Sequence, residues 1–525
     1  RKNCTKSGKD RQKSVCKKVR VPCVYMPRWT CKSPCYRGGA LLGRSKGQIL
    51  ECPDVESQIR AFFHFVEKSI GFKYNEDKSY CGKQGVSLKT VISGFPREDR
   101  LSFLAMLITL ILSPFLSEYI GPIFTLVTFV IFKLQCKKSG RHIEFGMTGK
   151  MMFVYMGYMI LSAMWSDNPI MSVLIGLLWM GMFLGALTVS NLATTEYRLD
   201  TMIYFAVIGG AFVGAIALIQ TLALYADLDF PNPFWGEIDA KVLGLLPGNL
   251  VDTNFVLEKP ASTFTNSLIF ATFMLVMFPF SLYSTVTQKG GRRVVSGVCV
   301  LIYFVSIAST YSRGAYLAII VALFVLMFLG RNYALNIGIT FVAVLAVLPS
   351  SVFRRLSEVS VKDFAVGERF KIWGACFDIF SNNFFLGIGA GSDNLHQRLV
   401  NDYGIHWPHA HNLYFEIMVE GGVVGLLLIG AVLAFIVKDC VKIISRGGKW
   451  KIMGMCTLSA VAGLMTMSLT EFTFQTPKEL QVVMVVMGFL EAALRLSAHA
   501  AERGEKAKKI VAAPAAPARI PEMIQ

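Results

Sequence analysis

The chain has 525 residues, of which 53% are hydrophobic and only 17% are charged, and its net charge is +18. Soluble globular proteins carry about 25% charged residues, so this composition excludes an ordinary soluble enzyme, and the many apolar residues exclude a chain that is disordered throughout. Residues 1–100 hold 22 Lys and Arg against 9 Asp and Glu. Because most of the positive charge lies in one fifth of the chain, we expect no nucleic-acid partner.

The first 98 residues differ in composition from the rest of the chain. They are basic and contain seven of the twelve cysteines. Their Lys and Arg content is typical of a cytoplasmic segment, where the reducing environment disfavours disulfides, and the spacing Cys31-x3-Cys35 matches no usual zinc pattern. We expect residues 1–98 to be a basic, Cys-containing cytoplasmic tail that is disordered. A metal site and a start codon placed too far upstream are the alternatives.

Twelve apolar runs follow along the rest of the chain. A transmembrane helix needs about 20 apolar residues, because a helix rises 1.5 Å per residue and the hydrocarbon core is about 30 Å thick. The runs are continuous rather than alternating, which favours helices over a β-barrel. The sequence therefore predicts an all-α polytopic membrane protein with about 12 transmembrane helices in a membrane domain at 99–497. The runs lie near 99–113, 118–135, 147–165, 170–190, 200–224, 263–287, 294–310, 315–330, 334–349, 412–437, 452–470 and 479–496.

The distribution of Lys and Arg indicates the orientation of these helices. Basic residues gather in alternate loops and after the last run, whereas the other short loops hold only Arg313 and Lys478. By the positive-inside rule, both termini lie in the cytoplasm and the long loops 225–262 and 350–411 face outward. Loops of this length are usually functional. Within the second, the amphipathic stretch 366–380 predicts a short helix lying on the membrane.

The C-terminal residues 498–525 form the last predicted segment. They include an Ala- and Pro-rich stretch at 511–519, a composition typical of a solvated linker rather than a packed element. We expect residues 498–525 to be a disordered cytoplasmic tail.

A histidine cluster precedes the tenth apolar run. Three of the seven histidines fall in His406-Trp407-Pro408-His409-Ala410-His411-Asn412, at the boundary where polar groups near lipid are costly and often functional. The segment has three interpretations: a polar helix cap with Asn412 turning the chain, a metal site, or the source of a general base, since histidine titrates near neutral pH. No cluster of Cys or carboxylates completes a metal site, so we expect none.

Two arginines lie at the same predicted boundary. Arg313 sits in a Ser-Arg-Gly segment between two apolar runs, which is either a tight turn or a phosphate ligand, because a guanidinium is always charged and donates two parallel hydrogen bonds. Arg369 lies 42 residues before His411. A Gly-x-Gly-x-Gly stretch at 387–391 follows Arg369, but no strand–turn–helix unit surrounds it. We therefore expect a compact turn there rather than a dinucleotide loop.

These motifs resemble those of a known family. His411-Asn412, followed after nine residues by Gly422-Val-Val-Gly425, resembles the H-[NSQ]-x9-G-x-x-G signature of bacterial O-antigen ligases. The Ser-Arg-Gly at 312–314, Arg369 and the glycine-rich turn are similar to the wider O-antigen ligase/polymerase superfamily, and the similarity covers residues 100–495. Leucines stand at 426–427, where the ligase signature often has Thr-Thr, and the segment beginning at Lys259 is a loose version of an Arg- and Gly-containing pattern.

The resemblance implies a metal-independent, cofactor-free glycosyltransferase of lipopolysaccharide biosynthesis, located in the bacterial inner membrane with a periplasmic active site. Such enzymes move a glycan from undecaprenyl diphosphate to an acceptor hydroxyl, typically on lipid A–core, with inversion at the anomeric carbon. Arg313 and Arg369 would hold the diphosphate, and His411 would be the general base, since arginine cannot act as a base at neutral pH. The further substrate-binding candidates are Lys259, His409, Asn412 and Glu420. Of these, His409 and Glu420 could also orient His411.

Alternative functions share parts of this pattern. A repeat-unit polymerase or a protein O-oligosaccharyltransferase would use the same donor and catalytic residues and differ in the acceptor. A membrane transporter is the alternative from another class, since twelve helices is a common transporter count. Transporters place ionisable residues near the bilayer midplane, whereas here they gather at the predicted outer boundary. That placement favours chemistry at the membrane surface.

Overall fold

The computed structural model describes residues 99–117, 120–226, 259–330, 364–474 and 476–512. Within these ranges all regular secondary structure is helical, as the sequence predicts. The helices are α3 (Arg100–Leu112), α4 (Ile120–Ser139), α5 (Met147–Leu161), η2 (Ser162–Met164), α6 (Pro169–Leu192), α7 (Glu196–Tyr225), α9 (Ser267–Thr287), α10 (Gly291–Ser309), α11 (Arg313–Leu329), α14 (Phe364–Asn382), α15 (Ser392–Tyr403), α16 (Leu413–Ser445), α17 (Gly448–Met467) and α18 (Pro477–Ala512).

Eight helices of the described ranges are long and apolar enough to cross a membrane, namely α4, α6, α7, α9, α10, α16, α17 and the Pro477–Glu502 part of α18. The apolar helices α3 and α11 are shorter. A multi-pass helical membrane protein is therefore confirmed. Eleven of the twelve predicted runs coincide with helices. The remaining run, 334–349, lies outside the described residues, so the count of twelve transmembrane helices stays a prediction.

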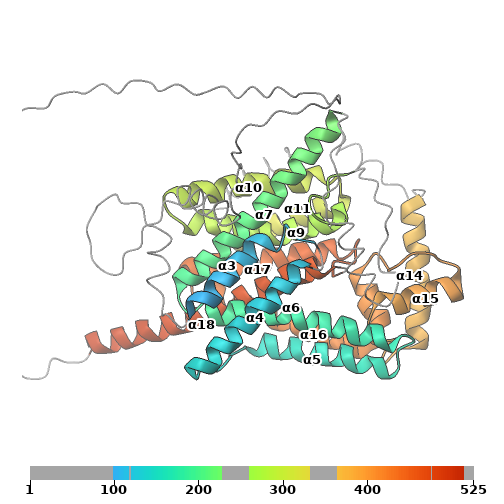
Figure 1. Cartoon of the computed structure of the whole chain (residues 1–525), viewed down its shortest axis with the longest axis horizontal. Coiled ribbons are helices and arrows are strands. Elements are labelled where there is room, and N and C mark those ends of the chain that lie inside the picture. The colour runs from blue at the N-terminus through green and yellow to red at the C-terminus, as the bar shows by residue number, and fades with distance from the viewer. Residues whose placement is uncertain (1–98, 118–119, 227–258, 331–363, 475, 513–525) are drawn as a thin grey trace, which may run out of the picture. The chain divides into compact units, whose positions relative to one another are not determined.

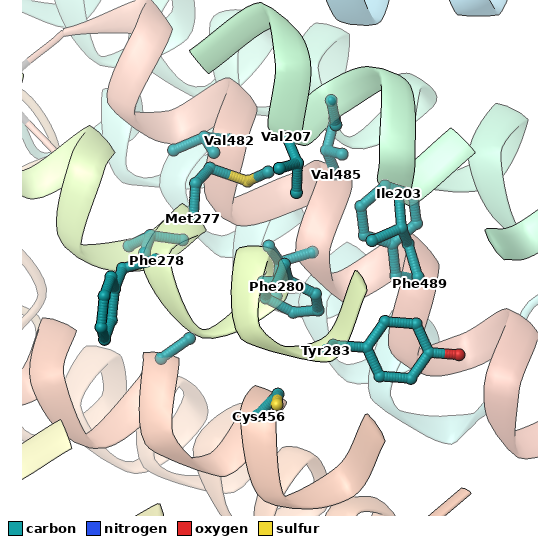
Figure 2. Close-up of a cluster of buried hydrophobic side chains, with 14 of the residues drawn as sticks. Ile203, Val207, Met277, Phe278, Phe280, Tyr283, Cys456, Val482, Val485 and Phe489 are labelled. Carbon is teal, nitrogen blue, oxygen red and sulfur yellow. The ribbon is translucent and has the colours of Figure 1, made fainter. Parts of the chain in front are cut away.

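A cluster of buried apolar side chains joins four of the spans (Figure 2). α9 is buried over most of its length and lies among α7, α17 and α18, which agrees with a helix that is apolar on all sides. Lipid tails are as apolar as leucine, so such helices are held together mainly by close packing. The side chains drawn in Figure 2 include Ile203, Val207, Met277, Phe278, Phe280, Tyr283, Cys456, Val482, Val485 and Phe489.

Small residues bring α7 and α10 close together. A Cβ at Gly210 would overlap the Tyr303 hydroxyl, so no larger residue fits against that ring. The same hydroxyl donates to the Val207 carbonyl at 3.1 Å. Ser306 Oγ likewise donates to the Gly214 carbonyl at 3.1 Å. These contacts follow the usual rule for membrane helices, in which small residues allow close approach and polar side chains bond to the neighbouring backbone.

Two helices lie within the predicted long loop 350–411. α14 contains the predicted amphipathic stretch 366–380, whereas α15 was not predicted. Both pack on α16, and α14 runs across the direction of α5 and α16 at one end of these helices (Figure 1). Phe370 and Phe377 are seven positions apart on α14, so they share a face, and both are exposed. An exposed aromatic face on a helix of this orientation agrees with the prediction of a helix lying on the membrane.

The glycine-rich segment forms a turn that packs into a break in α16. The backbone of Gly422 (φ 59°, ψ −161°) is not helical and divides α16 into two parts. The turn bonds to both sides of this break, with Ile388 N donating to the Val419 carbonyl and Val423 N donating to the Phe384 carbonyl, each at 2.9 Å. A Cβ at 422 would lie 2.5 Å from the Phe385 carbonyl oxygen, so the position requires glycine.

Charged side chains gather at the opposite end of the helices. Asp99 accepts from Arg141 at 3.0 Å and from Arg198 at 3.1 Å. Lys449, at the start of α17, pairs with Glu196 at 2.7 Å and with Asp200 at 3.3 Å. These residues flank helix ends that the Lys and Arg distribution assigns to the cytoplasm.

Parts of the predicted domain plan differ from the structure or lie outside it. α18 continues to Ala512, so residues 498–512 are helical rather than part of a disordered tail. The expectations for residues 1–98, for most of the loop 225–262, for the first part of the loop 350–411 and for residues 513–525 concern segments outside the described residues.

Candidate functional site

Asn412 connects the histidine segment to the loop 468–474, which joins α17 to α18. As the N-cap of α16, its Oδ1 accepts from Tyr414 N at 2.9 Å and from Phe415 N at 3.2 Å. Its Nδ2 donates to the Leu469 carbonyl at 2.9 Å. Both ends of the amide are therefore used within the protein. Asn412 acts as the cap that the first interpretation of the segment describes, and it fixes the residue before it.

His411 and Arg369 meet at one carboxylate, that of Glu471. His411 Nδ1 lies 3.4 Å from Glu471 Oε2, and Arg369 Nη2 donates to Glu471 Oε1 at 2.8 Å. His411 also has a positive φ of 49°, which is uncommon for a residue with a side chain. Backbone strain of this kind gathers at functional sites. The contact with Glu471 is made through Nδ1 and does not involve the other ring nitrogen, Nε2.

Two aromatic side chains flank the His411 ring. The buried His409 ring lies 4.2 Å from it, and the Trp407 ring lies 5.1 Å from it in an edge-to-face arrangement. Burial, together with the nearby charges of His411 and Arg369, lowers the pKa of His409 to about 3. His409 is therefore neutral at physiological pH. It cannot serve as a cation toward a diphosphate, and its contact with His411 is one of packing.

α14 is attached to the histidine segment one turn after Arg369. Trp373 Nε1 donates to the Ala410 carbonyl at 3.0 Å, and the indole stacks on Phe415 with ring centroids 5.5 Å apart. Residues four apart share a helix face, so this attachment directs Arg369 toward the same site. The short segment between Arg369 and Trp373 thereby sets the position of the guanidinium.

Arg313 begins α11 next to the loop 468–474. Ser312 is the N-cap, and its Oγ accepts from Ala315 N at 3.2 Å. Gly314 packs directly on Thr470, since a Cβ at 314 would overlap the Thr470 hydroxyl. Arg313 directly precedes Gly314, and Thr470, on which Gly314 packs, directly precedes Glu471. The three predicted catalytic residues come from three separate segments, and all of these segments contact the loop 468–474.

Glu420 and Glu416 lie one turn apart on the buried side of α16. Glu416 Oε2 accepts from Ala410 N at 2.8 Å, and this hydrogen bond ties the histidine segment to α16. The side chain of Glu420 interacts with the backbone of Gly391 in the glycine-rich turn. Both carboxyl groups are buried. Their recorded contacts support the loop and the turn, and the carboxylate that contacts His411 is that of Glu471 instead.

Lys259 begins a segment that packs on α7 and α18. Ser262 N donates to Gln220 Oε1 at 2.6 Å, and Lys478 Nζ donates to the Thr263 carbonyl at 2.7 Å. Lys478, one of the two cations predicted in the short outward loops, is only 1% exposed and lies over the Phe264 ring. It therefore serves this packing rather than an exposed binding surface.

Sequence reasoning did not select Glu471. The available signal was a single carboxylate, Glu471, directly after the run 452–470, at the same predicted boundary as Arg313 and His411. The partners predicted to orient His411 were instead His409 and Glu420, which lie closer to it in sequence. Within the described ranges, no group of three or more His, Cys, Asp or Glu side chains is placed to hold a metal ion.

An apolar cavity of about 210 Å³ begins at the first turns of α16 and extends away from the histidine segment. Leu413, Tyr414 and Ile417 line it near that end, and Trp179 of α6 and Leu490 of α18 line it elsewhere. The cavity lies among helices that the composition places in the membrane. Its position offers an apolar compartment next to the polar site.

The comparisons with known proteins concern the central part of the chain. Residues 298–430 match the family model described as O-Antigen ligase. This range includes Arg313, Arg369, His411 and Gly422, and it ends before Glu471. No curated protein matches the chain.

Proposed function

We propose that this chain, a member of the O-antigen ligase superfamily through its residues 298–430, transfers a glycan from undecaprenyl diphosphate to an acceptor hydroxyl at the periplasmic face of the bacterial inner membrane. The observation that carries the proposal is the meeting of His411 and Arg369 at Glu471, beside the helix start that bears Arg313. A base and two permanent cations next to an apolar cavity suit a lipid-linked, anionic donor.

The chemistry is a direct displacement. The acceptor oxygen forms a bond to the anomeric carbon, the bond from that carbon to the diphosphate oxygen breaks, and the diphosphate leaves with the electron pair. His411 Nε2 accepts the acceptor proton while Glu471 supports Nδ1, an arrangement in which a carboxylate orients the base. A positioned base of this kind contributes about 10²–10⁴-fold to the rate.

The two arginines stabilise the leaving group. Negative charge grows on the diphosphate as the bond breaks, and a guanidinium can donate two parallel hydrogen bonds to it. Arg369 is held at 2.8 Å by Glu471, so its position is fixed before substrate binds. We propose that Arg313 contacts the diphosphate from the start of α11. This pair supplies the positive charge that a metal ion provides in other phosphate sites.

The apolar cavity suits the isoprenoid part of the donor. Leu413 and Tyr414 line the cavity and directly follow the histidine segment, so a chain bound there would leave its diphosphate near His411. The cavity volume of about 210 Å³ holds only part of a long isoprenoid, and the remainder would extend into the bilayer. Lipid A–core is the proposed acceptor, with a polymerase or a protein O-oligosaccharyltransferase as the alternatives.

Reconstitution tests the proposal directly. The full-length chain in detergent is given undecaprenyl-diphosphate-linked glycan and lipid A–core, and glycosylated acceptor is measured. We expect His411→Ala to abolish transfer while donor binding persists, and Arg313→Lys and Arg369→Lys to impair transfer because lysine keeps the charge and loses the planar fork. Arg446→Lys, at the other end of α16, is the matched control and should transfer normally. A fully active His411→Ala variant, or inhibition by chelator reversed by a divalent ion, would reject this mechanism.

A further inference from the structure

A surface of aromatic and polar side chains lies beside the His411 ring. Trp407 is 39% exposed and Tyr403 is 38% exposed, and His406 between them is exposed as well. Exposed tryptophan is unusual unless the indole meets a ligand, a partner or lipid, because its large apolar area gains from being covered. Trp407 is also the exposed side chain whose ring contacts His411.

The chain reversal after α15 builds this surface. Gly404 adopts a left-handed conformation (φ 66°), and Ile405 N donates back to the Leu399 carbonyl at 2.9 Å. The chain then runs back along α15, so that the Trp407 carbonyl lies 2.9 Å from His396 Nδ1. His396 and Tyr403 are seven positions apart and share one face of α15. We call Trp407, His396 and Tyr403, which the reversal places along one face of α15, the α15 surface.

The α15 surface borders the open side of the candidate base. His409 covers one side of the His411 ring, and Glu471 occupies the direction of Nδ1. The His411 side chain is still 17% exposed. The Trp407 ring lies 5.1 Å from the His411 ring, so a group that packs on the indole would lie beside His411.

We infer that Trp407 forms the floor of a binding subsite for a sugar ring of the acceptor, with His406, His396 and Tyr403 as hydrogen-bonding partners for its hydroxyl groups. A sugar ring has one face of C–H groups that carry partial positive charge, and this face packs on the negative face of an indole. The surrounding hydroxyls need donors and acceptors at the edge of the ring, which imidazole and phenol side chains supply. The acceptor is then a saccharide and not a serine or threonine of a protein. This inference rests on the proposed function.

Direct binding separates this inference from the proposed function. The probes are core oligosaccharide freed from lipid A, the free repeat-unit oligosaccharide of the donor glycan, and a serine-containing peptide. Binding to the full-length protein in detergent is measured by calorimetry, without donor. We expect at least one saccharide to bind the unchanged protein. Its dissociation constant should rise about tenfold in Trp407→Ala. In Trp407→Phe it should stay within about threefold of that of the unchanged protein, because phenyl keeps an aromatic face.

The control is Phe377→Ala, which removes an exposed aromatic side chain from α14 and should leave saccharide binding unchanged. A transfer assay at saturating donor accompanies the binding measurement, and Trp407→Ala should raise the acceptor KM about tenfold while donor binding stays constant. Binding of the peptide alone, or of none of the probes, would overturn the inference. Equal saccharide binding by Trp407→Ala and the unchanged protein would overturn it too, and the proposed function would stand if transfer persists. If Trp407→Ala weakens donor binding as much as saccharide binding, the indole is structural and the inference fails.

Discussion

At the scale of single residues, Glu471 links His411, the proposed base, to Arg369, one of the two proposed diphosphate ligands. Its two oxygens contact His411 and Arg369 separately, so one carboxylate sets the geometry of both. Glu471→Gln keeps the shape and removes the charge, and we expect transfer to fall about 10- to 100-fold, a part of what a positioned base contributes. Donor binding should weaken as well, because Arg369 loses the charged partner that holds it in place.

The control for this variant is Glu368→Gln, which changes the residue directly before Arg369 on α14. Glu368 pairs with the exposed Lys371 at 2.7 Å, a surface ion pair that contributes little. Initial transfer rates of the two variants, measured at the same saturating donor concentration, give the comparison. If the transfer rate of Glu471→Gln equals that of Glu368→Gln, the carboxylate of Glu471 has no part in transfer.

His409 makes the stability of the site depend on pH. Burial, with the nearby charges of His411 and Arg369, lowers its pKa in the folded protein to about 3, whereas an unfolded chain has a histidine pKa of about 6.5. Below pH 6.5 the unfolded chain therefore takes up a proton that the folded protein excludes, and stability falls as the pH drops toward 3. At pH 5 this amounts to about 2 kcal/mol.

The measurement is thermal unfolding in detergent at pH 7 and pH 5. We expect His409→Gln to lose less stability than the unchanged protein between these pH values, because glutamine does not titrate. His406→Gln removes an exposed histidine and should follow the unchanged protein. Parallel losses for all three proteins would mean that His409 can be protonated in the folded state.

At the scale of elements, the break in α16 holds the site together. Gly422 adopts φ 59° and ψ −161°, a region essentially restricted to glycine, and it faces the glycine-rich turn. Gly422→Ala should cost about 1–3 kcal/mol in strain and displace the turn, which lowers both the unfolding temperature and transfer. Gly430→Ala lies later in the same helix, where no atom is near the added methyl group, and should be neutral. Equal stability of the two variants, measured by thermal unfolding, would contradict this role.

The sequence predicted the membrane helices more fully than the contacts between them. Long apolar runs identify membrane helices because the bilayer requires them, and eleven of the twelve runs are helices in the structure. α15 was missed because it is short and mostly polar, and its amphipathic pattern, with Leu395 and Leu399 buried, is not a long apolar run. Glu471 was missed because its partners are 60 and 102 residues away in sequence, and only the folded chain brings them together.

At the scale of the whole molecule, the orientation in the membrane decides where the site can work. The Lys and Arg distribution puts α15 outside and the end of α4 inside. The native Cys376 and Cys440 are both buried, so they cannot report this. Exposed positions serve instead: Asn401 on α15 and Lys138 at the end of α4.

Labelling of single introduced cysteines tests this orientation. The seven cysteines of residues 1–98 are first replaced by serine to remove background. Cells expressing either variant are then treated with a maleimide that does not cross the inner membrane. We expect Asn401→Cys to react in intact spheroplasts and Lys138→Cys to react only after lysis, because the first position would face the periplasm and the second the cytoplasm. The reverse pattern would place His411 and Arg369 in the cytoplasm, away from a periplasmic acceptor, and both the orientation and the proposed reaction would be wrong.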